Sequence, residues 1–379
     1  MAKTRSWRIG LLLTGGGARA AYQVGVLKAI SEMLGRPERN PFPILCGTSA
    51  GAINVGALAC QAEHFAASVD HLVDVWRNFH AARVYRCDPP AIIRSGARWL
   101  GAMMLIYRNN PVSLLDNSPL ATLLAQRLDF DRIEANIGAG SLYAVAVTAS
   151  GYASGQSVTF YQGAARLREW QRPQRVGIAT RLRLEHLLAS SALPFIFPAV
   201  KLGREYFGDG SMRQVAPVSP ALHLGADRVL VIGTGRQTVP VERARSNFYP
   251  SMAQIAGHAL NSIFLDSLAQ DVEWLQRINR MIETMPVDTR GHTGQHFRHV
   301  DVLVISPSQP IERFAANHVR ELPRSIKFLF RPMGVMRRAG SNLGSYLLFE
   351  PGFCEALIDL GFQDTLARRA ELERFLDGA

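Results

Sequence analysis

The sequence predicts an α/β fold, in which helices pack on a sheet of buried parallel strands. Residues 9–13 (IGLLL) form a short, continuous apolar run, which is the pattern of a central strand buried on both faces. Residues 20–34 then place apolar side chains at helical spacing, and Gly35 is a suitable end for that helix. Residues 41–60 repeat the order, with a short strand, a turn of small residues and a helix rich in Ala and Gly. Strand, helix, strand and helix in succession are how an α/β sheet begins.

Later segments continue this alternation of strands and helices. In chain order we expect a hairpin from 141–150 and 157–162, a helix around 183–189, a strand ending near Phe207, a strand within 227–235, a long helical stretch at about 251–285, and a strand within 300–308. Residues 288–299 (DTRGHTGQHFRH) are expected to form a loop.

The same features suggest how the chain is organised. We expect a core at 8–235, its continuation with a long helix and a further strand at 236–310, and a basic helical region at 311–379. Residues 83–115 interrupt the core, because their arginines surround an apolar centre that does not fit the strand–helix alternation. We interpret this segment as an insertion.

Composition and charge narrow the possible partners. The 379 residues carry a net charge of +11, so the surface should attract anions such as nucleic acid, anionic lipid headgroups or acidic small substrates. Nucleic acid is disfavoured, because the sequence has no zinc-finger spacing, no RNA-binding aromatic signature and no long block of Lys or Arg. The four cysteines form no CxxC pair, which favours reduced thiols and a cytoplasmic location. The longest apolar stretches fall short of the roughly 18 residues of a spanning helix, so any membrane contact should be peripheral, at the inner face.

The motif GTSAG at 47–51 has the pattern G-x-S-x-G. A nucleophilic serine on a sharp strand-to-helix turn needs very small neighbours two residues before and after it. Gly47 and Gly51 meet that need around Ser49, with Thr48 and Ala50 completing the turn. An apolar strand precedes the motif and a helix follows it, which is the context that a nucleophile elbow requires.

The glycine turn GGGARA at 15–20 has two interpretations. Its letters fit a dinucleotide-binding fingerprint, but that fold needs an acidic residue at the end of the second strand to hold the ribose. The second strand here ends at Ser49 instead. The turn is therefore better interpreted as an oxyanion hole, whose backbone N–H groups face the oxygen that becomes negative when Ser49 attacks an acyl carbonyl. The alternative is a simple packing turn. Arg19 fits either a ligand for a substrate phosphate or, slightly better, a structural ion pair.

A serine nucleophile needs a base, and the sequence offers two kinds. The histidines, among them His186, His223 and His258, lie in no strand-end motif. Asp209 lies at a strand end between two glycines, although Asp-Gly is also a common turn. An aspartate is a poor base unless burial raises its pKa. The sequence shows no cluster of metal ligands, and we expect neither a metal nor a cofactor.

Three segments together resemble the patatin-like phospholipases, particularly the bacterial members. They are LLLTGGGARAAYQVGVLKAI, CGTSAGAINVGAL and SSALPFIFPAVKLGREYFGDGS, in that order and spacing, and the resemblance covers residues 8 to about 235. It implies a three-layer α/β/α fold with a mostly parallel central sheet, here followed by a helical C-terminal extension. It also implies a serine acyl hydrolase with a Ser–Asp dyad.

The resemblance assigns a role to each motif. Ser49 is the expected nucleophile and Asp209 the expected base. The expected oxyanion hole is Gly15, Gly16, Gly17, Ala18 and Arg19. Where the family usually has Asp-Gly-Gly or Asp-Gly-Ala, this sequence has Asp209 followed by Gly210 and Ser211. Ala20 stands where the family usually has a glycine. Both are exchanges of one small residue for another.

Function and location follow as expectations. The leading one is hydrolysis of fatty-acyl esters of phospholipids, of the phospholipase A or lysophospholipase type. A carboxylesterase or thioesterase that acts on soluble esters is the alternative, and a catalytically silent lipid-binding protein is the third. Residues 93–107 combine apolar and basic side chains as a membrane-contacting helix or lid does, or as a helix packed on the domain does. A second basic stretch lies at 313–338.

Overall fold

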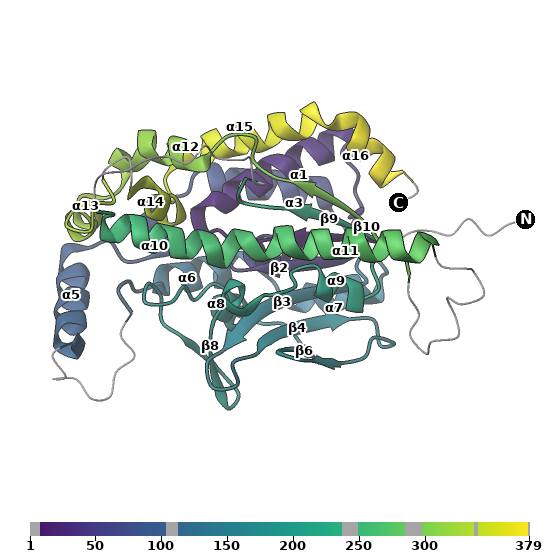
Figure 1. The fold of residues 1–379 in the computed structure, drawn as a ribbon, viewed down its shortest axis with the longest axis horizontal. Coiled ribbons are helices and arrows are strands. Elements are labelled where there is room, and N and C mark those ends of the chain that lie inside the picture. Colours follow the sequence, from purple (N-terminus) through teal and green to yellow (C-terminus); the bar gives the residue numbers. More distant parts are fainter. Residues whose placement is uncertain (1–7, 104–112, 237–248, 285–297, 337–339, 378–379) are drawn as a thin grey trace, which may run out of the picture.

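A computed structural model describes residues 8–103, 113–236, 249–284, 298–336 and 340–377 (Figure 1). Its strands are β1 (Ile9–Leu13), β2 (Ile44–Thr48), β3 (Ala144–Gly151), β4 (Ser157–Gly163), β5 (Trp170–Arg172), β6 (Arg175–Ala179), β7 (Val200–Leu202), β8 (Glu205–Asp209), β9 (Arg228–Ile232) and β10 (Asp301–Ile305). All of them belong to one mixed sheet, in the order β10-β9-β1-β2-β3-β4-β6-β5, with β8 paired to β3 and β7 to β8.

The first half of the described chain also contains helices. They are the 3₁₀ turn η1 (Gly17–Ala20), α1 (Ala21–Met33), α2 (Ala50–Cys60), α3 (Phe65–Arg77), α4 (Ala81–Val84), α5 (Pro89–Met103), α6 (Ser118–Arg127), α7 (Asp131–Gly138) and α8 (Leu184–Ser190). The strand–helix–strand–helix order expected for the first sixty residues is thus present as β1, α1, β2 and α2.

The second half adds further helices. They are the 3₁₀ turn η2 (Gly210–Arg213), α9 (Ser219–His223), α10 (Met252–Asn261), the π-helical turn η3 (Ser262–Asp266), α11 (Ser267–Thr284), α12 (Ile311–His318), η5 (Val319–Glu321), α13 (Arg324–Phe330), α14 (Ser341–Leu347), α15 (Pro351–Ala367) and α16 (Arg369–Leu376). In Figure 1, α10 and α11 run in line across the front of the sheet, and α15 lies beside α1 at the top.

The expected α/β fold with a mostly parallel sheet is confirmed. Strands β10, β9, β1, β2 and β3 are parallel, whereas β4 and β8 run antiparallel to β3. The predicted hairpin is the β3–β4 pair. Strand β1 shows why the sheet is covered on both faces. Leu11 and Leu13 belong to the core with α1, α2 and α15, and Leu12 between them belongs to a second core with α9 and α11.

The register of the parallel strands determines where a site can form. In β1, Leu13 pairs with Gly47 of β2, and Thr48 of β2 pairs with Thr148 of β3. On the far side of β3, Ala149 pairs with Asp209 of antiparallel β8. The chain segments that carry the three motifs therefore leave the sheet at one edge, where ligands of open α/β sheets bind.

Two expectations concern segments that are only partly described. The expected loop at 288–299 falls largely on residues outside the described part of the chain, and so does the end of the expected insertion, at 104–112. The described part of that insertion contains α4 and α5. The domain boundaries at 235 and 310 stay a prediction.

Candidate active site

Ser49 lies on the tight turn between β2 and α2. Its backbone has φ 56° and ψ −129°, a conformation that non-glycine residues adopt only when the surroundings enforce it. Its N–H donates to the Ser190 hydroxyl over 2.9 Å, and that hydroxyl donates to the carbonyl of Thr148 over 2.6 Å. The last turn of α8 therefore ties the strained elbow to the neighbouring strand β3.

The residues around Ser49 explain why this turn needs glycines. A Cβ on Gly47 would lie only 2.6 Å from the carbonyl oxygen of Gly51, and a Cβ on Gly51 would overlap the carbonyl oxygen of Leu13. Helix α2 can thus begin directly against β1 and β2. Thr48 is buried and donates to Oε1 of Gln214 over 2.9 Å, while Ala50 borders a cavity.

Asp209 ends β8 and is completely buried. One carboxylate oxygen, Oδ1, accepts the backbone N–H of Ser211 over 2.9 Å. Within the described residues the other oxygen, Oδ2, has no hydrogen-bond partner of ordinary geometry. Burial raises the pKa of Asp209 to about 6, and the nearby Ser49 hydroxyl and Ser211 act in the opposite direction without cancelling that effect. A carboxylate with this pKa is a much better base than an ordinary aspartate.

The histidines of the motif regions do not take part in this arrangement. His186 packs on Phe160 and its Nδ1 accepts the N–H of Arg183. His223 stacks on Trp170. No histidine in the described ranges hydrogen-bonds to Ser49 or Asp209. Among those residues, no three His, Cys, Asp or Glu side chains lie close enough together to hold a metal ion.

The glycine turn lies at the end of β1, next to the elbow. Gly17 has φ 56°, and a Cβ there would overlap the carbonyl oxygen of Tyr346, so only glycine fits. Gly17 and Ser49 border the same cavity. No hydrogen bond within the described residues takes up the N–H groups of Gly15 and Gly16, whereas Arg19 donates its N–H to the carbonyl of Gly16 over 3.1 Å. Ala18 and Ala20 are buried in η1.

The side chain of Arg19 forms a structural cluster, not a substrate site. It is 1% exposed, and its guanidinium donates to Ser345 Oγ (2.7 Å), Asn342 Oδ1 (2.5 Å) and Glu312 Oε1 (3.1 Å). The same group lies 4.1 Å from the ring centroid of Tyr346. Of the two interpretations of Arg19, the structure supports the ion pair. Its backbone N–H and its side chain are both engaged, so the N–H groups of Gly15 and Gly16 are the donors of the turn that stay free among the described residues.

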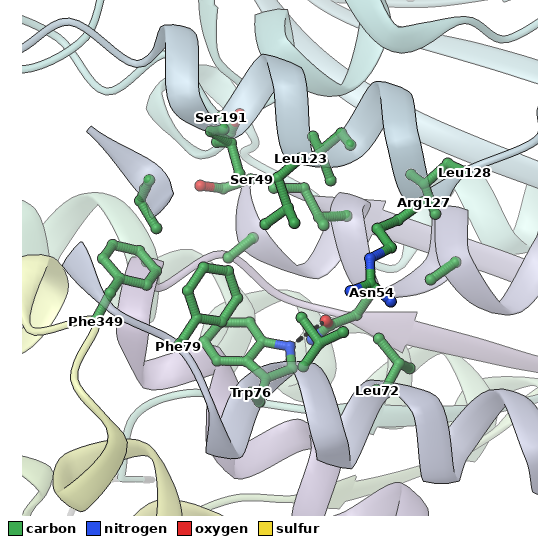
Figure 2. A pocket seen from close by; sticks show the side chains of 18 of the residues that line it. Ser49, Asn54, Leu72, Trp76, Phe79, Leu123, Arg127, Leu128, Ser191 and Phe349 are labelled. Atoms are coloured by element: carbon green, nitrogen blue, oxygen red, sulfur yellow. Dashed lines mark hydrogen bonds between the residues drawn. The ribbon is translucent and has the colours of Figure 1, made fainter. Parts of the chain in front are cut away.

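A mostly apolar cavity opens from Ser49 (Figure 2). The space between its lining side chains, including the part that is open to solvent, is about 820 Å³. Helices α2, α3 and α6 form most of its wall, and the loop before α15 adds Phe349. Large apolar side chains such as Trp76, Phe79 and Leu123 cover the wall. The cavity therefore suits a hydrocarbon chain whose reacting end reaches Ser49.

Several residues of this site were not singled out by sequence reasoning. Ser190 holds the elbow, Trp76 and Phe349 form the cavity, and Tyr346 supports the glycine turn from the C-terminal region. Only Ser190 had a signal, because it stands at the start of the SSALPFIFP segment. The others are ordinary apolar or aromatic residues whose role depends on the tertiary fold.

The expected membrane-contacting segment begins within α5. Ile93 is 69% exposed, and Arg94 and Arg98 beside it are also exposed. Residues 104–107 lie outside the described part. In the described chain, no helix combines the length and apolar character of a membrane span.

A family model and several known proteins match parts of this chain. The model of the patatin-like phospholipase family matches residues 11–222. A cGAMP-activated phospholipase of Pseudomonas aeruginosa is 29% identical over 217 residues, 56% of this chain and 55% of that protein. The uncharacterized protein YjjU of Escherichia coli is 28% identical over 228 residues, 60% of this chain and 52% of that protein. The chain thus spans about half the length of these relatives.

Solved structures are also similar, at low sequence identity. VipD of Legionella pneumophila aligns over 93% of this chain and 67% of its own, with a TM-score of 0.31. Human GIVD cytosolic phospholipase A2, in complex with methyl γ-linolenyl fluorophosphonate, aligns over 100% of this chain and 60% of its own, with a TM-score of 0.41. Both are 13% identical to this chain.

Proposed function

The chain belongs to the patatin-like phospholipase family, and from this premise we propose that it is a serine acyl hydrolase that releases fatty acids from phospholipid or lysophospholipid esters. One observation carries the proposal. Ser49, on its strained elbow, faces an apolar cavity, and the buried carboxylate of Asp209 lies at the same edge of the sheet. The cavity would take the acyl chain and the dyad would cleave the ester.

In the first step, Ser49 Oγ attacks the ester carbonyl carbon while its proton passes to the carboxylate of Asp209. Oδ2 is the oxygen without a hydrogen-bond partner among the described residues, so it is the one free to accept the proton. The carbonyl oxygen becomes negative, and the amides of the glycine turn at 15–17 stabilise it. The tetrahedral intermediate then expels the alcohol, which leaves with the proton held by Asp209. An acyl-Ser49 ester remains.

In the second step, water attacks the acyl-Ser49 carbonyl and gives its proton to Asp209. The same amides stabilise the second oxyanion. Ser49 Oγ then leaves, regains the proton from Asp209, and the fatty acid is released. Each cycle consumes one ester and one water and returns the dyad to its starting state.

The cavity favours lipid esters over soluble ones. Burial of each methylene group contributes about 0.8 kcal/mol, so a long chain in this cavity binds far better than an acetyl group. The test compares the wild type with Ser49→Ala on phospholipids and on short-chain esters and thioesters. We expect hydrolysis that increases with chain length up to the length that the cavity holds and is lost in the variant. Faster hydrolysis of short, soluble esters would favour the carboxylesterase alternative, and equal activity of both proteins would remove Ser49 as the nucleophile.

A lipid substrate also requires a surface that meets the membrane. Two exposed apolar side chains lie on neighbouring helices: Ile93 on α5, and Phe328, a residue that is 79% exposed, on α13. The helices meet where the Ser325 hydroxyl of α13 donates to the carbonyl of Cys87, just before α5. Exposed arginines accompany them at 94, 98, 324 and 331. Apolar side chains surrounded by cations are suited to an anionic lipid surface. We include this α5–α13 surface in the proposal, as the face that docks on the membrane.

A further inference from the structure

The cavity has two chemically different ends. Along α2, the lining residues Ala50, Ile53 and Ala57 follow one face of the helix away from Ser49. Figure 2 shows Ser49, Phe79 and Phe349 at one end, and Leu72, Arg127 and Leu128 at the other. The cavity is thus a channel that starts at the nucleophile and follows α2 toward the end of α6.

Two polar side chains at the far end have no structural task in the described chain. Elsewhere in the wall, Asn54 accepts the indole N–H of Trp76 (3.0 Å), and Ser191 donates to the carbonyl of Leu187 (2.9 Å). Arg127, in contrast, forms no ion pair or hydrogen bond within the described residues, and neither does His71. Both line the channel, and Figure 2 shows the Arg127 side chain extending from α6 toward the wall formed by α2 and α3.

The length of the channel sets which part of a substrate meets this cation. Ser49 and Ala57 are eight residues apart, which corresponds to about 12 Å along a helix, or an extended acyl chain of about ten carbons. With its carbonyl at Ser49, a chain of that length ends beside Arg127. A terminal methyl group there would displace water from a guanidinium and give nothing in return, whereas a carboxylate would form charge-assisted hydrogen bonds.

We propose that the far end of the channel, formed by Arg127 and His71, binds a carboxylate at the end of the acyl chain, so that the preferred substrates are esters of medium-length chains that carry a terminal carboxylate. This inference rests on the proposed function, because it takes Ser49 as the group that attacks the other end of the same chain. Arg127 then acts as a specificity-determining residue for chain length and for the chemistry of the chain terminus.

The experiment uses three sets of p-nitrophenyl esters whose chains are shorter than, equal to and longer than the channel. Each length is made with a terminal methyl, carboxylate or ammonium group, and kcat/KM is measured for each. At the matching length we expect the wild type to prefer the carboxylate over the methyl group about three- to tenfold, a modest factor because Arg127 is partly in water. The ammonium ester should be the poorest.

Substitutions separate pairing with Arg127 from general attraction to a basic protein. Arg127→Gln should remove the preference, and Arg127→Glu should reverse it in favour of the ammonium ester. Arg132→Glu, five residues further along the chain and outside the cavity wall, is the control for charge and should keep the wild-type order. Arg127→Gln keeps the test valid if the charge reversal harms folding.

Each result has a defined meaning. A carboxylate preference of equal size at all three lengths, or one that survives in Arg127→Glu, would overturn the inference, since it would reflect the net charge and not the channel. So would equal rates for methyl and carboxylate esters in the wild type. Ser49→Ala, tested on the same esters, keeps the two proposals distinct. If Ser49→Ala is inactive and the wild type shows no charge preference, the proposed hydrolase activity stands and only the role of Arg127 is removed.

Discussion

At the scale of single residues, the proposed dyad of Ser49 and Asp209 combines two groups that are weak on their own. A serine hydroxyl is a poor nucleophile without a base, and an aspartate in water is a poor base. Burial makes Asp209 a stronger base, because it raises the pKa of the carboxylate to about 6. The backbone N–H of Ser211 holds that carboxylate in place. The proposed mechanism therefore depends on a carboxylate that is basic enough to accept a proton and still ionised at neutral pH.

The pH dependence of the reaction tests this point. The carboxylate of Asp209 accepts a proton only when it is ionised, so kcat/KM should fall about tenfold per pH unit below a pKa near 6 and level off above it. Asp209→Asn should lower kcat by about 10² to 10⁴-fold above pH 7, and its residual activity should not fall further through the pH range near 6. Activity is measured with a soluble ester, so that the charge of the lipid surface does not change with pH.

Asp271 provides the matched control for this profile. Burial raises the pKa of Asp271 as well, and its carboxylate accepts the N–H of Val218, but it lies outside the cavity. Asp271→Asn should leave the acid limb of the profile, the fall of kcat/KM below pH 6, in place. An acid limb that persists in Asp271→Asn and is centred near pH 4 would mean that Asp209 is not the group that titrates.

Short motifs with the expected flanks, together with the family resemblance in the case of Asp209, led to Ser49, the glycine turn and Asp209 as candidate site residues. They could not predict that Asp209 becomes basic, since that depends on its complete burial by distant segments. They also left two interpretations of Arg19. Only the contacts with Asn342, Ser345 and Glu312, about three hundred residues away, decided in favour of the structural one.

At the scale of elements, the glycine turn is supported from both sides. Thr234, after β9, donates to the carbonyl of Gly15 over 2.5 Å, and Tyr346 of α14 packs against Gly17. Arg19 links η1 to α12 and α14. Strands and helices of the first sixty residues were predictable from apolar runs and helical spacing. These long-range contacts were not, because no local pattern encodes them.

Replacement of Arg19 tests whether this support matters for catalysis. Arg19→Ala should lower kcat about 10- to 100-fold with little change in KM, because the oxyanion amides lose their fixed position while the acyl channel is unchanged. It should also destabilise the fold by about 3 kcal/mol, since it removes a buried guanidinium and leaves its hydrogen-bond partners Ser345 and Asn342 without a donor. Arg19→Lys should recover part of kcat.

The exposed pair of Arg36 and Asp70 is the control for this replacement. Arg36→Ala should change the free energy of unfolding by less than about 1 kcal/mol and leave kcat as it is. Steady-state kinetics and chemical denaturation measure both effects. A fall in stability after Arg19→Ala without a fall in kcat would mean that the cluster holds only the C-terminal helices and not the glycine turn.

At the scale of the whole molecule, the site extends beyond the part that the family model matches. That match ends at residue 222, whereas Thr234, Phe264 and Tyr346 pack around the glycine turn. Helix α15 buries Phe353, Leu357 and Ile358 completely in the core that α1 shares. The C-terminal helices, expected from sequence as an extension, are therefore part of the main core in this structure.

The α5–α13 surface makes a prediction about membrane binding. Ile93→Asp combined with Phe328→Asp should lower the partition coefficient on anionic vesicles by at least about tenfold, because two exposed apolar side chains no longer enter the lipid surface. Vesicle sedimentation measures this, and hydrolysis of a soluble ester by the same variant shows that the dyad is intact. Met281→Asp, at an equally exposed position on α11, is the control. Equal losses in both variants would mean that the surface has no special role.

The most direct test of the central claim is covalent labelling with a long-chain fluorophosphonate, followed by mass spectrometry of the intact and digested protein. We expect one added phosphonyl group, on the peptide that contains Ser49. We expect no label in Ser49→Ala, and labelling of Asp209→Asn that is slower by about 10² to 10⁴-fold although the variant is folded. A label on another residue, or wild-type labelling rates in Asp209→Asn, would contradict the Ser49–Asp209 dyad.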